Sequence, residues 1–256
     1  MLPATPLLAQ GSQPDALAAL RAAVDSEMLA SRTDRSNWMY RDEDDTPEHK
    51  AVYNTVETPQ GSLRRLIELD GHPLGPGAVL DELTRIQAYV HDSAAQNHAR
   101  RNGQHDDAQA AELLRMLPDA FLWNISGQNA ETITLDFRPN PAFDPPDTQS
   151  RVLGAMAGQL VIARNGNRIR SLRGRLTREI VFGLAMFGKL DAGGTFDVER
   201  RVVGDGRWQI TETHVHIGGR ALFFKTIGTQ EDEVKTGWKP STDATLAAAA
   251  HTLGAN

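Results

Sequence analysis

The chain has 256 residues, of which 40% are hydrophobic and 23% are charged, a composition typical of a globular protein with a sizeable core. Its formal net charge of −6 disfavours a nucleic-acid partner, because a surface that neutralises phosphates must be basic. The absence of cysteine excludes disulfides, thiolate catalysis and cysteine-bound zinc. No apolar run approaches the roughly 20 residues of a transmembrane helix. We expect no cofactor.

The N-terminal residues 1–14 allow two interpretations. The stretch 7–12 resembles the end of an export signal near its cleavage site, although no basic segment precedes it. A disordered tail is the other interpretation. We expect a periplasmic or secreted protein whose signal peptide is truncated or absent in this chain.

Helical and extended patterns alternate in the first half. Apolar residues at three- and four-residue spacing predict an amphipathic helix over residues 15–30. Three strands are then predicted, over residues 37–41, 49–58 and 62–70. The segment 42–47 is predicted to be a turn. Residues 76–117 are predicted to be a helical insertion, in which the polar stretch 91–107 forms an exposed extension or a frayed loop.

Short alternating segments dominate the second half. Strands are predicted over residues 121–126, 132–137, 158–164, 168–180, 195–203, 208–217 and 220–227. Asn165-Gly166 and Asp205-Gly206 lie between such segments and are strong local signals for β-hairpins. The proline-rich loop 138–146 cannot join a central ladder. The tail 241–256 is expected to be mostly disordered, with a transient helix over 245–251.

This order of elements predicts an α+β fold class with a single large curved antiparallel β-sheet. The sheet is expected to be a half-barrel with helices covering its concave face, because a meander with one apolar face needs such a cover. The domain is predicted to span residues 15–240.

Local patterns along the chain carry a resemblance to a known family. They are the segment 65–74, in which an apolar strand runs into a Gly-His-Pro-Leu turn, the segment 113–121, and the segments 135–141 and 151–160 together. In these patterns and in its element order the chain resembles the periplasmic lipoprotein-carrier family (the Lol-type, outer-membrane lipoprotein-sorting fold) and uncharacterised secreted bacterial proteins of that type. The resemblance implies an apolar cavity for acyl chains, with a lipid or an acylated protein as the partner.

Candidate ligand contacts come from two groups of side chains. Apolar residues of the first helix and of the later strands are candidates to line the cavity or its mouth: Leu17, Leu20, Val24, Phe182, Phe187, Trp208 and Phe223. Arginines concentrate on adjacent strands, and Arg168, Arg170 and Arg175 are candidates to bind an anionic headgroup. Cross-strand ion pairs with acidic residues are the alternative role for these arginines.

His214 and His216 share one side of a predicted strand, a spacing at which two imidazoles can chelate zinc. A third ligand is needed, and no ligand cluster of matching spacing accompanies them. We therefore favour a solvent-facing polar strip and predict no metal site.

No nucleophile elbow, phosphate-binding loop, dinucleotide fingerprint or metalloprotease pair occurs, so the chain is predicted not to be an enzyme. We expect a non-enzymatic cell-envelope binding or carrier protein that holds a lipid or acylated ligand in an apolar cavity. One alternative is a cell-envelope protein–protein interaction module with a self-filled core, for which the apolar segment 181–190 offers a contact surface. A further alternative is a zinc-dependent hydrolase that uses His214 and His216.

Overall fold

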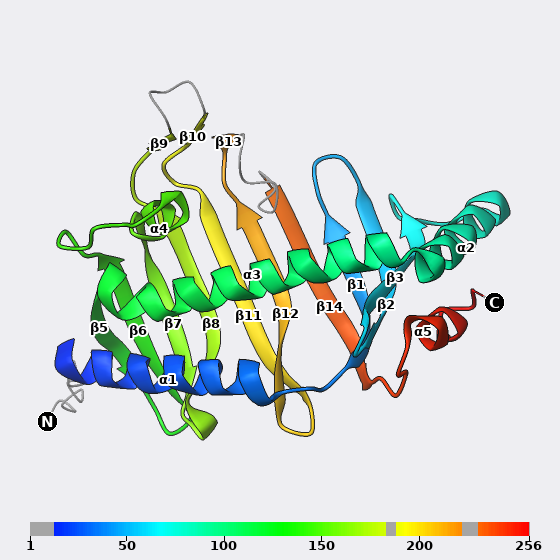
Figure 1. Cartoon of the computed structure of the whole chain (residues 1–256). Coiled ribbons are helices and arrows are strands. Elements are labelled where there is room, and N and C mark those ends of the chain that lie inside the picture. Colours follow the sequence, from blue (N-terminus) through cyan, green and yellow to red (C-terminus); the bar gives the residue numbers. More distant parts are fainter. Residues whose placement is uncertain (1–12, 183–187, 222–229, 256) are drawn as a thin grey trace, which may run out of the picture.

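The computed structural model describes residues 13–182, 188–221 and 230–255. Within these ranges one open, curved antiparallel sheet of 11 strands dominates the molecule, in the order β4-β3-β2-β1-β14-β12-β11-β8-β7-β6-β5 (Figure 1). Its strands are β1 (Trp38–Asp45), β2 (Lys50–Thr58), β3 (Gly61–Leu69), β4 (His72–Pro73), β5 (Phe121–Gln128), β6 (Thr132–Pro139), β7 (Met156–Ala163), β8 (Arg168–Leu176), β11 (Thr195–Gly204), β12 (Arg207–His216) and β14 (Gln230–Pro240). The predicted fold class is confirmed.

Five α-helices and a small second sheet complete the described part of the chain. The helices are α1 (Gln13–Thr33), α2 (Pro76–His91), α3 (Ser93–Ala120), α4 (Thr148–Leu153) and α5 (Leu246–Thr252), with a 3-10 turn η1 at Asn165–Asn167. The second sheet has three strands, β9 (Ile180–Phe182), β10 (Gly188–Leu190) and β13 (Gly219–Ala221). None of the described helices is long and apolar enough to cross a bilayer.

The helices α1 and α3 lie across the same face of the large sheet (Figure 1). The apolar stripe that periodicity predicts on α1 packs against this face of the sheet. Leu20 is fully buried there and Val24 is only 6% exposed. They join a cluster that includes Trp123 and Leu135 of the strands beneath. Each buried side chain of this size contributes about 1.5–3 kcal/mol of hydrophobic free energy, so this cluster holds α1 on the sheet.

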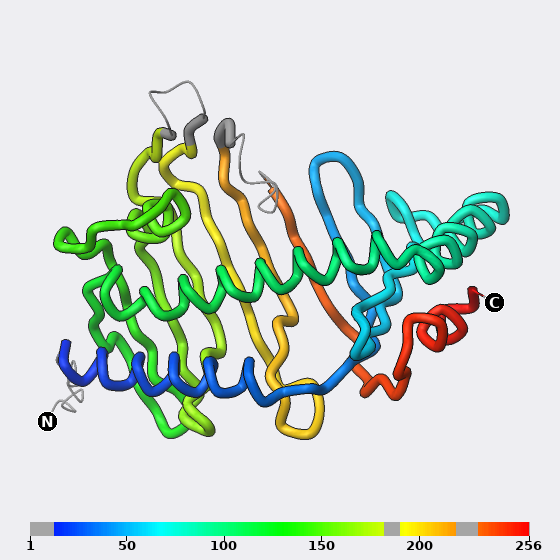
Figure 2. Tube along the Cα trace, in the orientation of Figure 1, coloured from blue at the N-terminus to red at the C-terminus, as the bar shows by residue number. Residues whose placement is uncertain are grey.

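Of the two alternatives for the polar stretch 91–107, the exposed extension is confirmed from Ser93 onward and the frayed loop is wrong. His91 ends α2, and the stretch from Ser93 belongs to α3. This helix begins after Asp92, whose carboxylate accepts hydrogen bonds from the backbone N–H groups of Ala94 and Ala95. Every residue from 97 to 108 is nevertheless exposed. The helix is anchored at its far end, where Leu117 is buried and its carbonyl accepts a hydrogen bond from the Trp123 indole at 3.0 Å. The continuous path of α3 across the sheet is clear in Figure 2.

The tail 241–256 was expected to be mostly disordered, with a transient helix over 245–251; at that position the structure has α5 (Leu246–Thr252), which is packed against the rest of the fold. Leu246 of α5 is 2% exposed and packs with Ile86 of α2 and with Val56 and Leu63 of the sheet. Val56 and Leu63 are directly opposite each other in the ladder, so this cluster covers one face of β2 and β3. The short apolar run Leu246–Ala250 therefore has a surface to bury, which the local sequence does not reveal.

Two further expectations about the strands were wrong. The predicted turn 42–47 is mostly strand, since β1 continues to Asp45. The central strand β14 was not predicted, because Gln230-Glu-Asp-Glu233 lacks an alternation of apolar and polar residues. β14 pairs with both β1 and β12, so it joins the N-terminal strands to the rest of the sheet.

Candidate functional site

The large sheet is split at one end, where β11 leaves β8. The two strands pair only over Thr195–Glu199, and a bulge follows at Arg200. Beyond it β11 pairs only with β12, and their hairpin extends past the C-terminal end of α1 (Figure 1). Asp205 and Gly206 have φ values of 46° and 72°, the two consecutive positive values that a tight hairpin turn requires.

Two adjoining pockets lie where the hairpin leaves the sheet, and we call them together the hairpin groove. The larger pocket has a volume of about 560 Å³ and is lined by the C-terminal part of α1 and the following Asp34, by η1 and by the hairpin. The smaller has a volume of about 400 Å³ and lies against the turn between β5 and β6. Both share Asn165, Val202 and Trp208. Their volumes are within the range of small-molecule sites, about 300–1,000 Å³.

The larger pocket has an exposed apolar wall. Leu29 at the end of α1 is 64% exposed and Val202 of β11 is 53% exposed. Trp208 of β12 lies directly opposite Val202 in the ladder and is half-buried. Two large apolar side chains of the hairpin and one from the distant helix α1 thus line one open pocket, where burial against an apolar ligand is favourable.

The polar lining of the hairpin groove is strongly basic. Five arginines line the two pockets, namely Arg168, Arg170, Arg200, Arg201 and Arg207. Only two acidic residues accompany them, Asp34 and Glu131. Guanidinium groups at this density favour an anionic ligand group, because each can donate two parallel hydrogen bonds to a carboxylate or phosphate.

Two of the arginines are fixed in place by Glu27 of α1. The Glu27 carboxylate accepts hydrogen bonds from Arg168 at 3.0 and 2.9 Å and from the backbone N–H of Ile169 at 2.8 Å. Arg200 lies 2.6 Å from the same carboxylate. Burial acts to raise the pKa of Glu27, but the hydrogen bonds from Arg168 and the charge of Arg200 outweigh it and hold the pKa below its usual value. The charged carboxylate therefore ties α1 to β8 and β11.

Arg170 and Arg207 are held more loosely. Arg170 lies 3.5 Å from Glu199, and Arg207 lies 3.6 Å from Asp34. Both distances exceed those of a good charge-assisted hydrogen bond, about 2.7–2.9 Å. Their side chains are 50% and 47% exposed, so both guanidiniums have donors available for a ligand.

The predicted arginines have different positions in the structure. Arg168 lines the larger pocket and Arg170 the smaller, each together with Trp208. Arg175 is exposed and lines neither of these pockets. The alternative role as ion pairs also occurs on this sheet, since Arg173 lies 2.8 Å from Asp197.

The predicted apolar contacts are divided between the core and the hairpin groove. Leu20 and Val24 are in the packed core, and Leu17 packs against it, so these three line neither pocket. The structure describes the backbone of Phe182 in β9 and not its side chain. Phe187 and Phe223 lie outside the described residues.

His214 and His216 contact a single carboxylate on β14. His214 Nδ1 lies 2.5 Å and His216 Nε2 lies 3.0 Å from Asp232. Burial acts to raise the pKa of Asp232, but the hydrogen bonds of the two histidines outweigh it and lower the pKa. In the described ranges, the histidine pair does not belong to a set of three convergent metal-ligand groups.

Sequence reasoning missed Leu29, Val202 and Arg207. Leu29 and Val202 lay within a correctly predicted helix and strand, and Arg207 lies between the predicted Asp205-Gly206 turn and the predicted strand 208–217. No local signal shows that the end of α1 lies beside this turn. The chain matches no family model, no curated protein and no solved structure.

Proposed function

We propose that this chain is a non-enzymatic binding or carrier protein whose hairpin groove holds an anionic amphiphile, such as a fatty acid or an acyl group with an acidic headgroup. The observation that carries the proposal is the meeting of an apolar wall with loosely held arginines in one open pocket of about 560 Å³. Binding of a ligand needs this combination, because apolar contact supplies free energy and a charged partner fixes orientation.

The apolar part of the ligand would lie on Leu29, Val202 and Trp208. These side chains leave apolar surface in water in the free protein, and covering it stabilises a complex by about 25 cal/mol for each Å². The acidic group would face Arg207, which lies 3.6 Å from Asp34. Arg168 is fixed by Glu27 and would add positive potential rather than a new hydrogen bond.

The resemblance to periplasmic lipoprotein carriers supports the same class of ligand and a role in the periplasm or outside the cell. In this proposal the site differs in position from the cavity expected between the sheet and α1. The core beneath α1 is filled by side chains such as Leu20, Trp123 and Leu135, whereas the hairpin groove is open.

The test is a titration of the purified chain with a fluorescent long-chain fatty acid, with the fluorescent alcohol of equal length as a headgroup control. We expect Leu29→Asp to weaken fatty-acid binding about tenfold or more, equivalent to ~1.4 kcal/mol. Leu80→Asp is the matched control, because Leu80 is 65% exposed on α2 and lines neither pocket. An N-palmitoylated peptide, measured in parallel, distinguishes a free fatty acid from an acylated partner.

The headgroup contact is tested separately by Arg207→Gln. This change should weaken binding of the fatty acid and leave binding of the alcohol unchanged, because only the acid presents a negative charge. Arg173→Gln on β8 is the control, since Arg173 is 58% exposed and lines neither pocket. The proposal would be overturned if the wild-type chain bound neither the fatty acid nor the peptide. It would also be overturned if Leu29→Asp and Leu80→Asp bound the fatty acid equally well.

A further inference from the structure

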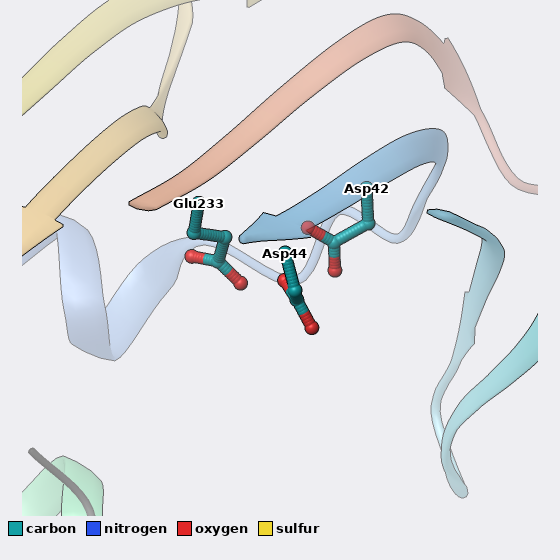
Figure 3. Close-up of side chains that lie close together, drawn as sticks. All are labelled: Asp42, Asp44 and Glu233. Carbon is teal, nitrogen blue, oxygen red and sulfur yellow. The ribbon is translucent and has the colours of Figure 1, made fainter. Parts of the chain in front are cut away.

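Three carboxylates converge where β1 meets β14 in the middle of the sheet. The register places Asp42 opposite Lys235 and Asp44 opposite Glu233. Two like charges directly opposite each other destabilise a ladder, so the Asp44–Glu233 pair needs a compensating group. Figure 3 shows Asp42, Asp44 and Glu233 grouped together, and one oxygen from each lies within 4.8 Å of the others. We call these three residues the carboxylate cluster.

The surroundings of the carboxylate cluster carry excess negative charge. Arg64 contacts Asp44 at 2.6 Å and Asp42 at 3.1 Å, and Lys235 lies 2.7 Å from Glu233. Three carboxylates against these two cations leave one excess negative charge, which favours the binding of a cation.

Two oxygen atoms of the carboxylate cluster are buried and accept no hydrogen bond from the described residues. The Asp42 side chain is only 3% exposed, and its Oδ1 atom accepts no hydrogen bond from the described residues. The Oδ1 atom of Asp44 is likewise buried and unbonded. Such atoms are rare in folded proteins, because removing a charged oxygen from water costs free energy that no partner offsets. Burial, followed by the charge of Glu233, raises the pKa of Asp42 to about 6.

We propose that Asp42, Asp44 and Glu233 form a binding site for a divalent cation that prefers oxygen ligands, with calcium or magnesium as the class. Calcium binds oxygens at about 2.3–2.6 Å, so two oxygens on one ion lie at most about 4.6–5.2 Å apart, and the three oxygens of the cluster, all within 4.8 Å of one another, satisfy this limit. Waters would complete the coordination from the side of Asp44 and Glu233, whose side chains are 16% and 23% exposed. The cation would link β1 to β14, the one pairing that connects β4-β3-β2-β1 with the other seven strands of this sheet.

The experiment is calorimetric titration of the chelator-treated chain with CaCl₂, with MgCl₂ and with MnCl₂ at pH 7.5, where Asp42 is ionised. We expect one site per chain with a Kd of ~10⁻⁴–10⁻³ M, the class of weak extracellular calcium sites. Glu233→Gln and Asp44→Asn should each weaken binding at least about tenfold, since each removes one of three charged ligands. Saturating cation should also raise the Tm of the wild-type chain and of neither variant.

Asp197→Asn is the matched control, because Asp197 is an aspartate on a strand of the same sheet that pairs with an arginine and is not in the carboxylate cluster. Terbium luminescence excited through nearby aromatic residues gives a second, local measurement, as Tyr53 lies opposite Asp42 in the ladder. This signal should appear with the wild-type chain and with Asp197→Asn, and be lost in Glu233→Gln. Either of two results would overturn the proposed site. One is the absence of wild-type binding at ~10 mM cation, which is well above the weakest expected Kd. The other is equal affinity in Glu233→Gln and Asp197→Asn.

Discussion

Replacing Glu27 with alanine should destabilise the fold strongly, because this side chain connects α1 to two strands. Its carboxylate is 8% exposed and contacts Arg168, Arg200 and the backbone N–H of Ile169. The alanine variant leaves both guanidiniums without this anion, and Arg200 retains its hydrogen bond to the Ile169 carbonyl at 3.2 Å.

The magnitude follows from the burial of the partners. Removing one member of a buried ion pair costs about 3–5 kcal/mol. Arg168 and Arg200 keep 16% and 18% of their side chains exposed, so water partly solvates the orphaned charges. We therefore expect a loss of about 3 kcal/mol, which in a chain of this size lowers the Tm by roughly 6–12 °C.

The loss should depend on pH, because the pKa of Glu27 is lowered in the folded chain. A carboxylate whose folded pKa is below its unfolded value stabilises the fold at pH values above the unfolded pKa, here 4.5. The contribution disappears as the pH falls from 4.5 through the lowered folded pKa. The difference between the wild type and Glu27→Ala should thus be full at pH 7 and shrink in acid.

Urea unfolding followed by circular dichroism measures this difference. Asp197→Ala is the control, since Asp197 forms an exposed ion pair with Arg173 and should cost only about 0–1 kcal/mol. Equal unfolding free energies for Glu27→Ala and Asp197→Ala at pH 7 would refute the role assigned to Glu27. A difference from the wild type that stays constant down to pH 3 would refute the electrostatic reasoning.

Three further substitutions test the packing of the fold by the same unfolding assay. Gly158→Ala should lower the unfolding free energy by ~1–3 kcal/mol or more, because a Cβ would lie 1.9 Å from the Arg173 carbonyl oxygen; an unchanged midpoint would contradict this close approach. Gly103→Ala should raise stability by ~0.5–1 kcal/mol, since a Cβ at this exposed position of α3 would meet no atom within 4 Å beyond the adjacent backbone of its own helix; a loss of stability would argue against a continuous helix. Leu246→Ala should cost ~2–5 kcal/mol because Leu246 is 2% exposed, and a cost near zero would show that α5 is not docked.

Local sequence patterns predicted many of the helices and strands, because one face of each such element lies against the core along its whole length. The stripe of Leu20 and Val24 faces the core along α1, and the Asp205-Gly206 turn has backbone angles that few other residues adopt. The prediction failed for elements that are buried by segments distant from them in the sequence. Five of the eleven residues of β14 are charged, and among them Asp232 pairs with His214, which only the fold brings beside it.

Sequence alone determined the α+β class, the antiparallel hairpins and the concentration of arginine, because periodicity, turn residues and composition are local properties. Tertiary structure alone decided which of those arginines share a pocket with Leu29 and Trp208, and that Asp42, Asp44 and Glu233 converge. The physical reason is the strand order. Inserting the last strand beside the first brings together residues about 190 positions apart, such as Asp44 and Glu233, and no property of either segment specifies that pairing.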